Sequence, residues 1–169
     1  MFQSSIILQQ TYQKTLQMHK IIISDTSCFI ILANIGELDL LHKVYGQIAT
    51  TLEIATEFGE TLPEWVEILT VVDKSKQLLL EMQIDKGESS AIALAIETPN
   101  STVIIDDYKA RKIAEKLGLT YTGTIGVIIK AKLLGIIPSI KPILNRIKQT
   151  DFRLSADIEL QALKEAKEI

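Results

Sequence analysis

The sequence predicts an α/β fold in which a parallel sheet lies between two layers of helices. The first observation is a pair of short β-branched runs, Ile21–Ile23 and Val103–Ile105, which carry no charge and are therefore typical of strands buried on both faces. The second is the alternation of short strand-like runs with helical segments. The third is composition, because 47% of the 169 residues are hydrophobic, which is enough for a substantial core.

Five segments have the composition of short strands, and apolar spacing predicts helices between and after them. The predicted strands are Ile21–Asp25, Ile48–Thr50, Val66–Val72 (at an edge of the sheet), Val103–Ile105 and Leu119–Tyr121. The predicted helices cover approximately residues 27–41, 52–58, 74–83, 88–98, 107–117, 124–134, 140–148 and 156–166.

Particular residues mark where these helices begin and end. Thr26 or Ser27 is suited to cap the first helix, while Gly36 weakens it and is a candidate point of division. Gly59 is expected to end the second helix. Asp85–Glu88 is interpreted as a turn that precedes the helix opened by its last residue.

Composition excludes several classes of protein. Cys28 is the single cysteine, so an internal disulfide and a thiolate zinc cage within one chain are impossible, which fits a reducing cytoplasm. No apolar stretch reaches the roughly 18 residues of a membrane span, since Asp25 interrupts the longest one, so we expect no membrane insertion. The Gln-rich first 20 residues lack the basic start and the long apolar segment of a secretory signal.

We expect residues 1–19 to form an N-terminal extension and residues 20–169 to form a single domain. Met18 stands just before the first predicted strand, so we interpret residues 1–17 either as a mobile, poorly packed extension or as a mis-assigned start. Neither an internal repeat nor a linker rich in Gly, Ser or Pro divides the remainder.

The net charge of −3 hides an asymmetry along the chain. Residues 21–105 contain 13 acids and 4 bases, whereas residues 106–153 contain 4 acids and 10 bases. The pattern indicates a cation site beside a surface for a polyanion, or alternatively an ordinary solvated helix face. The basic part includes Lys109, Arg111, Lys112, Lys116, Lys130 and Lys132.

Acids follow the two buried strands directly. Asp25 comes after the first run, and Asp106 and Asp107 come after Val103–Ile105. The carboxyl ends of parallel strands face the crevice where open α/β sheets bind ligands. Two carboxylates about 4 Å apart repel by about 4 kcal/mol at an effective dielectric of about 20, and a divalent cation removes that cost. The arrangement therefore predicts a metal site, with one residue of the pair Asp106–Asp107 as a ligand and the other as a helix cap.

Two glutamates are further candidate ligands. Glu57 lies four residues after Glu53, so both side chains share one helix face, where such residues are also common as solvated charge. Glu88 opens a helix of small residues that is able to approach the sheet closely, although the helix dipole alone also favours an acid there. Carboxylate oxygens, with no zinc-type cluster of Cys and His, favour Mg²⁺ or Mn²⁺.

Five segments resemble PIN-domain proteins in their order and spacing, and the resemblance covers residues 20–166. The branch of the family that they resemble most is a predicted nucleic-acid-binding group once labelled a domain of unknown function. The five segments are Ser24–Ser27, Leu32–Leu41, Gly87–Ala95, Ile105–Arg111 and Thr122–Gly126. The branch is similar to the toxin nucleases of type II toxin–antitoxin pairs.

The resemblance implies a three-layer α/β/α fold and a Mg²⁺- or Mn²⁺-dependent ribonuclease. Asp25, Glu57 and Glu88 match the first three acids of the family, and Asp107 or Asp106 matches the last. Ser27 matches a polar position near the first acid. The resemblance further implies RNA as substrate, a small antitoxin as partner, and a homodimer, for which the apolar faces of the two C-terminal helices also argue.

The residues and the resemblance together lead to a hypothesis of metal-assisted phosphodiester hydrolysis. Lys109, Arg111 and Lys130 would hold the RNA backbone. One alternative is a non-catalytic module of the same fold that binds nucleic acid or protein. A phosphatase of the haloacid dehalogenase type is disfavoured, because Ser27 stands where a second aspartate is needed.

Overall fold

The computed structural model describes residues 20–169, and the extension expected over residues 1–19 lies outside this described part. Its centre is a sheet of five parallel strands in the order β3-β2-β1-β4-β5. The strands are β1 (Ile21–Ser24), β2 (Ile48–Thr51), β3 (Val66–Leu69), β4 (Ser101–Ile104) and β5 (Thr120–Thr122).

The direction in which strands are added reverses between β1 and β4. The chain moves outward from β1 through β2 to β3, then returns and adds β4 and β5 on the other side. β1 and β4 pair in parallel, with Ser24 opposite Ile104. Ligands of open α/β sheets bind at such a reversal, beyond the carboxyl ends of the strands.

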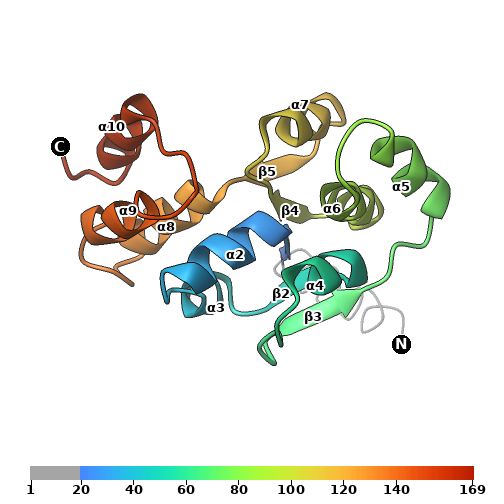
Figure 1. The fold of residues 1–169 in the computed structure, drawn as a ribbon, viewed down its shortest axis with the longest axis horizontal. Coiled ribbons are helices and arrows are strands. Elements are labelled where there is room, and N and C mark those ends of the chain that lie inside the picture. The colour runs from blue at the N-terminus through green and yellow to red at the C-terminus, as the bar shows by residue number, and fades with distance from the viewer. Residues whose placement is uncertain (1–19) are drawn as a thin grey trace, which may run out of the picture.

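Helices cover both faces of the sheet, which confirms the predicted three-layer α/β/α arrangement (Figure 1). On one face lie α2 (Thr26–Asn34), α3 (Asp39–Tyr45) and α8 (Thr124–Leu133), followed by α9 (Lys141–Ile147) and α10 (Ala156–Glu165). On the other lie α6 (Lys86–Glu97), with α5 (Lys74–Glu81) beside it, and α7 (Tyr108–Lys116). Helix α4 (Leu52–Phe58) contacts both α2 and α6.

Local sequence explains most helix ends. Gly36 has φ +73° and lies between α2 and α3, so the expected first helix is divided where the glycine stands. The Thr51 hydroxyl accepts a hydrogen bond from the Ile54 amide and caps α4. Gly59 ends α4 in the left-handed conformation, as its position predicted.

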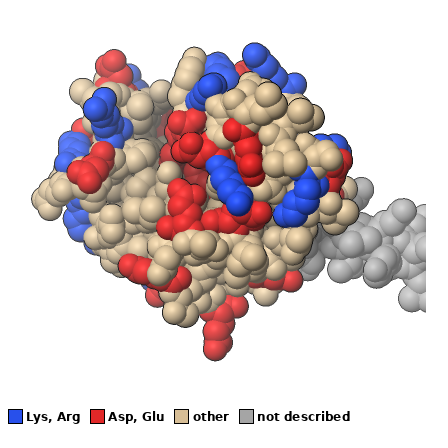
Figure 2. All heavy atoms as spheres, turned by 45° about the vertical axis from the view of Figure 1, so that its right-hand side comes forward, with Lys and Arg blue, Asp and Glu red and all other residues tan. Residues whose placement is uncertain are grey.

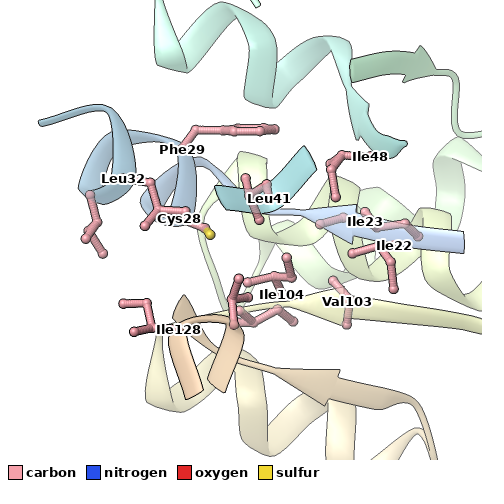
Figure 3. Packing of buried hydrophobic residues seen from close by; sticks show 14 of the residues in the cluster. Ile22, Ile23, Cys28, Phe29, Leu32, Leu41, Ile48, Val103, Ile104 and Ile128 are labelled. Atoms are coloured by element: carbon pink, nitrogen blue, oxygen red, sulfur yellow. The ribbon is translucent and has the colours of Figure 1, made fainter. Parts of the chain in front are cut away.

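The core is aliphatic and surrounds the central strands (Figure 3). Ile22 and Ile23 of β1 are buried on opposite faces of the sheet, and Val103 and Ile104 of β4 are buried beside them. Phe29 of α2 is fully buried and packs against Phe58 of α4 with ring centroids 5.7 Å apart. This packing fixes the first turn of α2, and therefore Asp25, against the sheet.

Three details differ from the sequence predictions. Helix α6 begins at Lys86, so most of the segment predicted as a turn is the first turn of a helix. Strand β3 ends at Leu69, because the amides of Val72 and Asp73 donate to the carboxylate of Glu97 instead of to a neighbouring strand. The apolar face predicted on α9 is covered by the chain itself, since Ile140, Ile143, Leu144 and Ile147 are buried.

None of the helices within residues 20–169 combines the length and the apolar character that a membrane span requires.

Candidate functional site

Asp25 and Asp106 meet at the carboxyl ends of the adjacent strands β1 and β4. The Asp25 amide donates to the carbonyl of Ile104 over 3.1 Å and so continues the ladder between the strands by one residue. The Asp25 carboxylate accepts from the Asp106 amide at Oδ2 (3.1 Å) and from the Cys28 amide at Oδ1 (2.9 Å). With only 1% of its surface exposed, Asp25 caps α2 and also joins the two strand ends.

The Asp106 carboxylate joins the end of β4 to the start of α8. Its Oδ1 accepts from the Thr124 amide over 2.8 Å, and its Oδ2 accepts from the Thr124 hydroxyl. Thr124 is fully buried, so this contact holds the first turn of α8 against the strand ends. Gly123 lies close by, and a Cβ there would clash with the guanidinium of Arg111.

Asp107 has a different role from its neighbour. Its Oδ2 accepts from the Ala110 amide over 2.9 Å and caps α7. The side chain is exposed, and its charge acts on Glu88 at the start of α6. The adjacent aspartates therefore diverge, with Asp106 beside Asp25 and Asp107 as a cap that faces Glu88.

Burial raises the pKa of three carboxyl groups at this site, and repulsion from neighbouring acids adds to the effect for two of them, Asp25 and Glu88. Burial raises the pKa of Asp25 well above its ordinary value, and the charge of Asp106 adds to the effect. Burial also raises the pKa of Asp106, against the hydrogen bonds from Thr124 and the nearby charge of Arg111. The pKa of Glu88 rises to about 7, mainly because of burial and to a smaller extent because of the charges of Asp107 and Asp85. Negative charge is thus destabilised here in a way that a cation relieves.

Glu57 and Glu88 share a small hollow with Asp25. The hollow is lined by Asp25, Thr26, Ser27, Glu57, Asp85 and Glu88. Glu57 is exposed on α4, and its Oε2 accepts from the Thr26 hydroxyl over 3.0 Å. Gly87 leaves room for this contact, because a Cβ there would lie 2.5 Å from Glu57 Oε2.

The fold thus gathers all five predicted acids at one edge of the sheet. Figure 2 shows Asp and Glu side chains in a band across the middle of one face, with Lys and Arg around and within it. As the side chains stand, no three acids, histidines or cysteines among residues 20–169 are close enough together to hold a metal ion. Glu57 and Glu88 have long side chains that are at least partly exposed, and the Glu57 carboxylate already contacts Thr26, the neighbour of Asp25.

The predicted substrate-binding residues are not all brought to this edge. Ser27 lines the hollow, and Arg111 lies beside Asp106, with its Nε donating to the carbonyl of Ile105 over 2.7 Å. Lys109 is exposed in the first turn of α7. Lys130 is not at the site, because its Nζ lies 4.4 Å from the centre of the Tyr45 ring, which precedes β2 at the opposite end of the strands.

Sequence reasoning assigned no role to Thr124 or to Thr26 as a partner of Glu57. Both are the first residue of a helix, and a single residue separates each of them from the end of the preceding strand. Thr124 belongs to the segment Thr122–Gly126 that the resemblance singled out. The signal was present, but which carboxylate each hydroxyl contacts depends on which strands are neighbours.

The family model DUF3368, described as a PIN domain, matches residues 21–168, which is most of the chain. Neither the curated proteins nor the solved structures contain a match.

Proposed function

Because the chain belongs to the PIN-domain family, whose members are generally nucleases, we propose that it is a ribonuclease that uses Mg²⁺ or Mn²⁺ to hydrolyse RNA phosphodiester bonds. One observation carries the proposal. Asp25 and Asp106, from strands far apart in the chain, are joined at the sheet edge, and both have pKa values raised by burial. Glu57, Glu88 and Asp107 lie around this pair.

The donor set fits a hard divalent cation. Every candidate ligand offers carboxylate oxygen, which Mg²⁺ and Mn²⁺ prefer. Burial together with repulsion raises the pKa of Asp25 and of Glu88, so a positive charge between them would be stabilising. Asp25, Glu57, Glu88 and Asp106 would hold the cation, with Asp107 beside Glu88.

When bound, such a cation supplies a nucleophile by lowering the pKa of water and neutralises charge that develops on the phosphate. The residues of the chain provide the positioning. Asp25 cannot swing away, because two backbone amides hold its oxygens. The hydrogen bond from Arg111 Nε to the Ile105 carbonyl keeps the Arg111 guanidinium beside Asp106. In this position the guanidinium would bind a phosphate oxygen of RNA.

The biological setting is also part of the proposal. We expect the protein to act in the cytoplasm as the toxin of a type II pair, inhibited by a small antitoxin, and to form a homodimer. The buried α9 face is unavailable for pairing, so a dimer would use other apolar residues. Candidates are Leu133 and Leu134 at the end of α8 and Leu160 on α10, which are about half exposed (53%, 55% and 48%).

The decisive experiment is an RNA cleavage assay with Mg²⁺ or Mn²⁺. Asp25→Asn and Glu88→Gln remove one negative charge each while keeping the shape of the side chain. Glu64→Gln is the matched control, since Glu64 is exposed and lies outside the hollow and both grooves described below. We expect both site variants to lose at least about a hundredfold in rate and the control to cleave normally. Equal cleavage by wild type and by both site variants would reject the proposal.

A non-catalytic module of the same fold is the second candidate. Two observations favour it. Among the described residues no three side chains are already arranged to bind a metal ion. In addition, the positive charge of Arg111 partly neutralises Asp106 without a cation. Binding of RNA by wild-type protein, with no cleavage of any RNA in the presence of either cation, would support it.

A further inference from the structure

Two grooves leave the carboxylates in different directions, and their linings differ in charge. The α10 groove, of about 540 Å³, begins at Asp106 and lies among α7, β5, α8 and α10. The α4 groove, of about 570 Å³, begins at Glu57 and lies between α4 and the start of α6. Both volumes fall within the range of ordinary ligand sites.

The α4 groove is unsuitable for phosphate. Its charged lining consists of three acids, Glu53, Glu57 and Asp85, against one base, Lys86. A polyanion there would meet net negative charge, even if a cation were bound at its inner end.

The α10 groove carries two arginines against two acids, Asp106 and Glu165, so its lining has no net charge. Arg111 lies at its inner end near Asp106, and Arg153 lies on the segment that leads into α10. Arg153 is exposed, and it takes part in none of the ion pairs found among residues 20–169. The acid on the outer wall, Glu165, accepts a hydrogen bond from Gln161 over 2.8 Å. Arg153 is therefore available to a phosphate.

Between the arginines the groove has an aromatic and apolar wall. Tyr121 of β5 and Phe152, which precedes Arg153, both line it and are half-buried. The Arg111 guanidinium lies 6.0 Å from the centre of the Tyr121 ring. Alternation of aromatic rings with arginines is the combination that binds single-stranded nucleic acid, where bases stack and phosphates pair with charge.

We propose that the α10 groove binds the nucleotide of single-stranded RNA next to the phosphate that is cleaved. Arg153 pairs with a backbone phosphate and Tyr121 with Phe152 forms the wall for the base. The inference rests on the proposed function and adds that RNA is held on the α10 side of the carboxylates only. A base in a duplex is unable to reach this wall, so the substrate must be unpaired there.

The test measures RNA binding with catalysis switched off. A fluorescein-labelled single-stranded RNA oligonucleotide is titrated with the full chain in EDTA, and anisotropy gives the dissociation constant at several salt concentrations. Arg153→Gln removes the phosphate partner, and Lys164→Gln is the matched control, because it removes one charge from exposed Lys164 of α10 outside the groove. Tyr121→Leu removes the ring, whereas Tyr121→Phe keeps it.

We expect Arg153→Gln to bind RNA roughly fivefold more weakly or worse and to lower the salt slope by about 0.7. Tyr121→Leu should also weaken binding roughly fivefold or more, with Tyr121→Phe near wild type. Lys164→Gln should stay within roughly twofold of wild type. Arg153 is exposed, so its replacement leaves the core intact even where Tyr121→Leu fails to fold.

Equal dissociation constants for Arg153→Gln and Lys164→Gln, in a protein that still cleaves RNA, would overturn the groove assignment and leave the proposed function standing. A wild-type protein that neither binds nor cleaves RNA would overturn both.

Discussion

The Asp106 amide donates a hydrogen bond to Oδ2 of Asp25 over 3.1 Å, although the two residues are 81 positions apart in the chain. The contact exists because β1 and β4 are neighbours in register, with Ser24 opposite Ile104, so that Asp25 lies beside the chain that continues through Ile105 to Asp106. Hydrogen bonds hold both carboxylates, that of Asp25 through two backbone amides and that of Asp106 through the amide and hydroxyl of Thr124. The inner half of the candidate site is therefore rigid, whereas Glu57 and Glu88 at its rim are adjustable.

Divalent cations should stabilise the folded protein. Mg²⁺ or Mn²⁺ that binds only the native state raises the free energy of unfolding by about 2.7 kcal/mol at about a hundred times its dissociation constant. Thermal unfolding near pH 7.5, with and without the cation, measures the effect. Asp25→Asn should lose most of the shift and Glu64→Gln should keep it. If the cation raised the unfolding temperature of wild type, Asp25→Asn and Glu64→Gln by the same amount, its binding site would lie elsewhere.

Without divalent cations, stability should fall as the pH rises toward neutrality. The pKa of Glu88 is raised in the folded state from 4.5 to about 7. As the pH rises, the Glu88 carboxyl group therefore loses its proton at a lower pH in the unfolded chain than in the folded one. Between about pH 4.5 and 7 the unfolded state is thus favoured increasingly, and the raised pKa values of Asp25 and Asp106 act in the same direction.

Glu88→Gln isolates the contribution of Glu88 to this pH dependence. Above pH 7 the variant should be more stable than wild type, because it carries no negative charge at this position. The gain should be only about 1 kcal/mol, because water partly screens the charge of a half-buried carboxylate. Chemical denaturation in EDTA at pH 5 and pH 8 measures the difference. An equal difference at both pH values would contradict the assignment of the proton to Glu88.

Thr124 should matter for stability more than any exposed threonine. Thr124→Val removes the hydroxyl that donates to Asp106 and leaves a buried carboxylate oxygen without that partner, at a cost of about 1–3 kcal/mol. Thr120→Val, at an exposed threonine of β5, is the matched control and should change stability by less than about 0.5 kcal/mol. Urea denaturation of the two variants tests this, and similar midpoints would refute it.

Gly87 should be needed for activity more than for folding. In Gly87→Ala the new Cβ would lie 2.5 Å from Glu57 Oε2 and 3.2 Å from Thr26 Oγ1. The closer obstacle is the end of a flexible side chain, so Glu57 should turn away and lose its bond to Thr26. We expect RNA cleavage to fall roughly tenfold or more, with stability within about 1 kcal/mol of wild type.

A double-mutant cycle separates this effect from a general disturbance of α6. If Gly87→Ala acts through Glu57, adding it to Glu57→Ala should cause no further loss of cleavage. Fully additive losses in the double variant would show that Gly87 acts by another route.

The pair Asp106–Asp107 marks the limit of what sequence patterns reveal. Both follow a buried strand and precede a helix, so either one could have been the cap. The structure separates them, because α7 begins at Tyr108, which makes Asp107 the N-cap and leaves Asp106 against Asp25 and Thr124. Lys130 is a second case, since charge alone grouped it with Arg111 although α8 carries it to the far end of the sheet.

The sequence by itself determined the parallel α/β fold, three of the five strands to within one residue at each end, and the gathering of acids at the carboxyl ends of β1 and β4. These follow from local signals, since burial on both faces selects apolar runs and the polar residues begin where the strands end. Only the tertiary structure decided which oxygen meets which donor, which basic residue reaches the carboxylates, and that one groove carries both arginines. Those facts depend on strand order and on how the helices pack, which join residues that no short stretch of chain contains together.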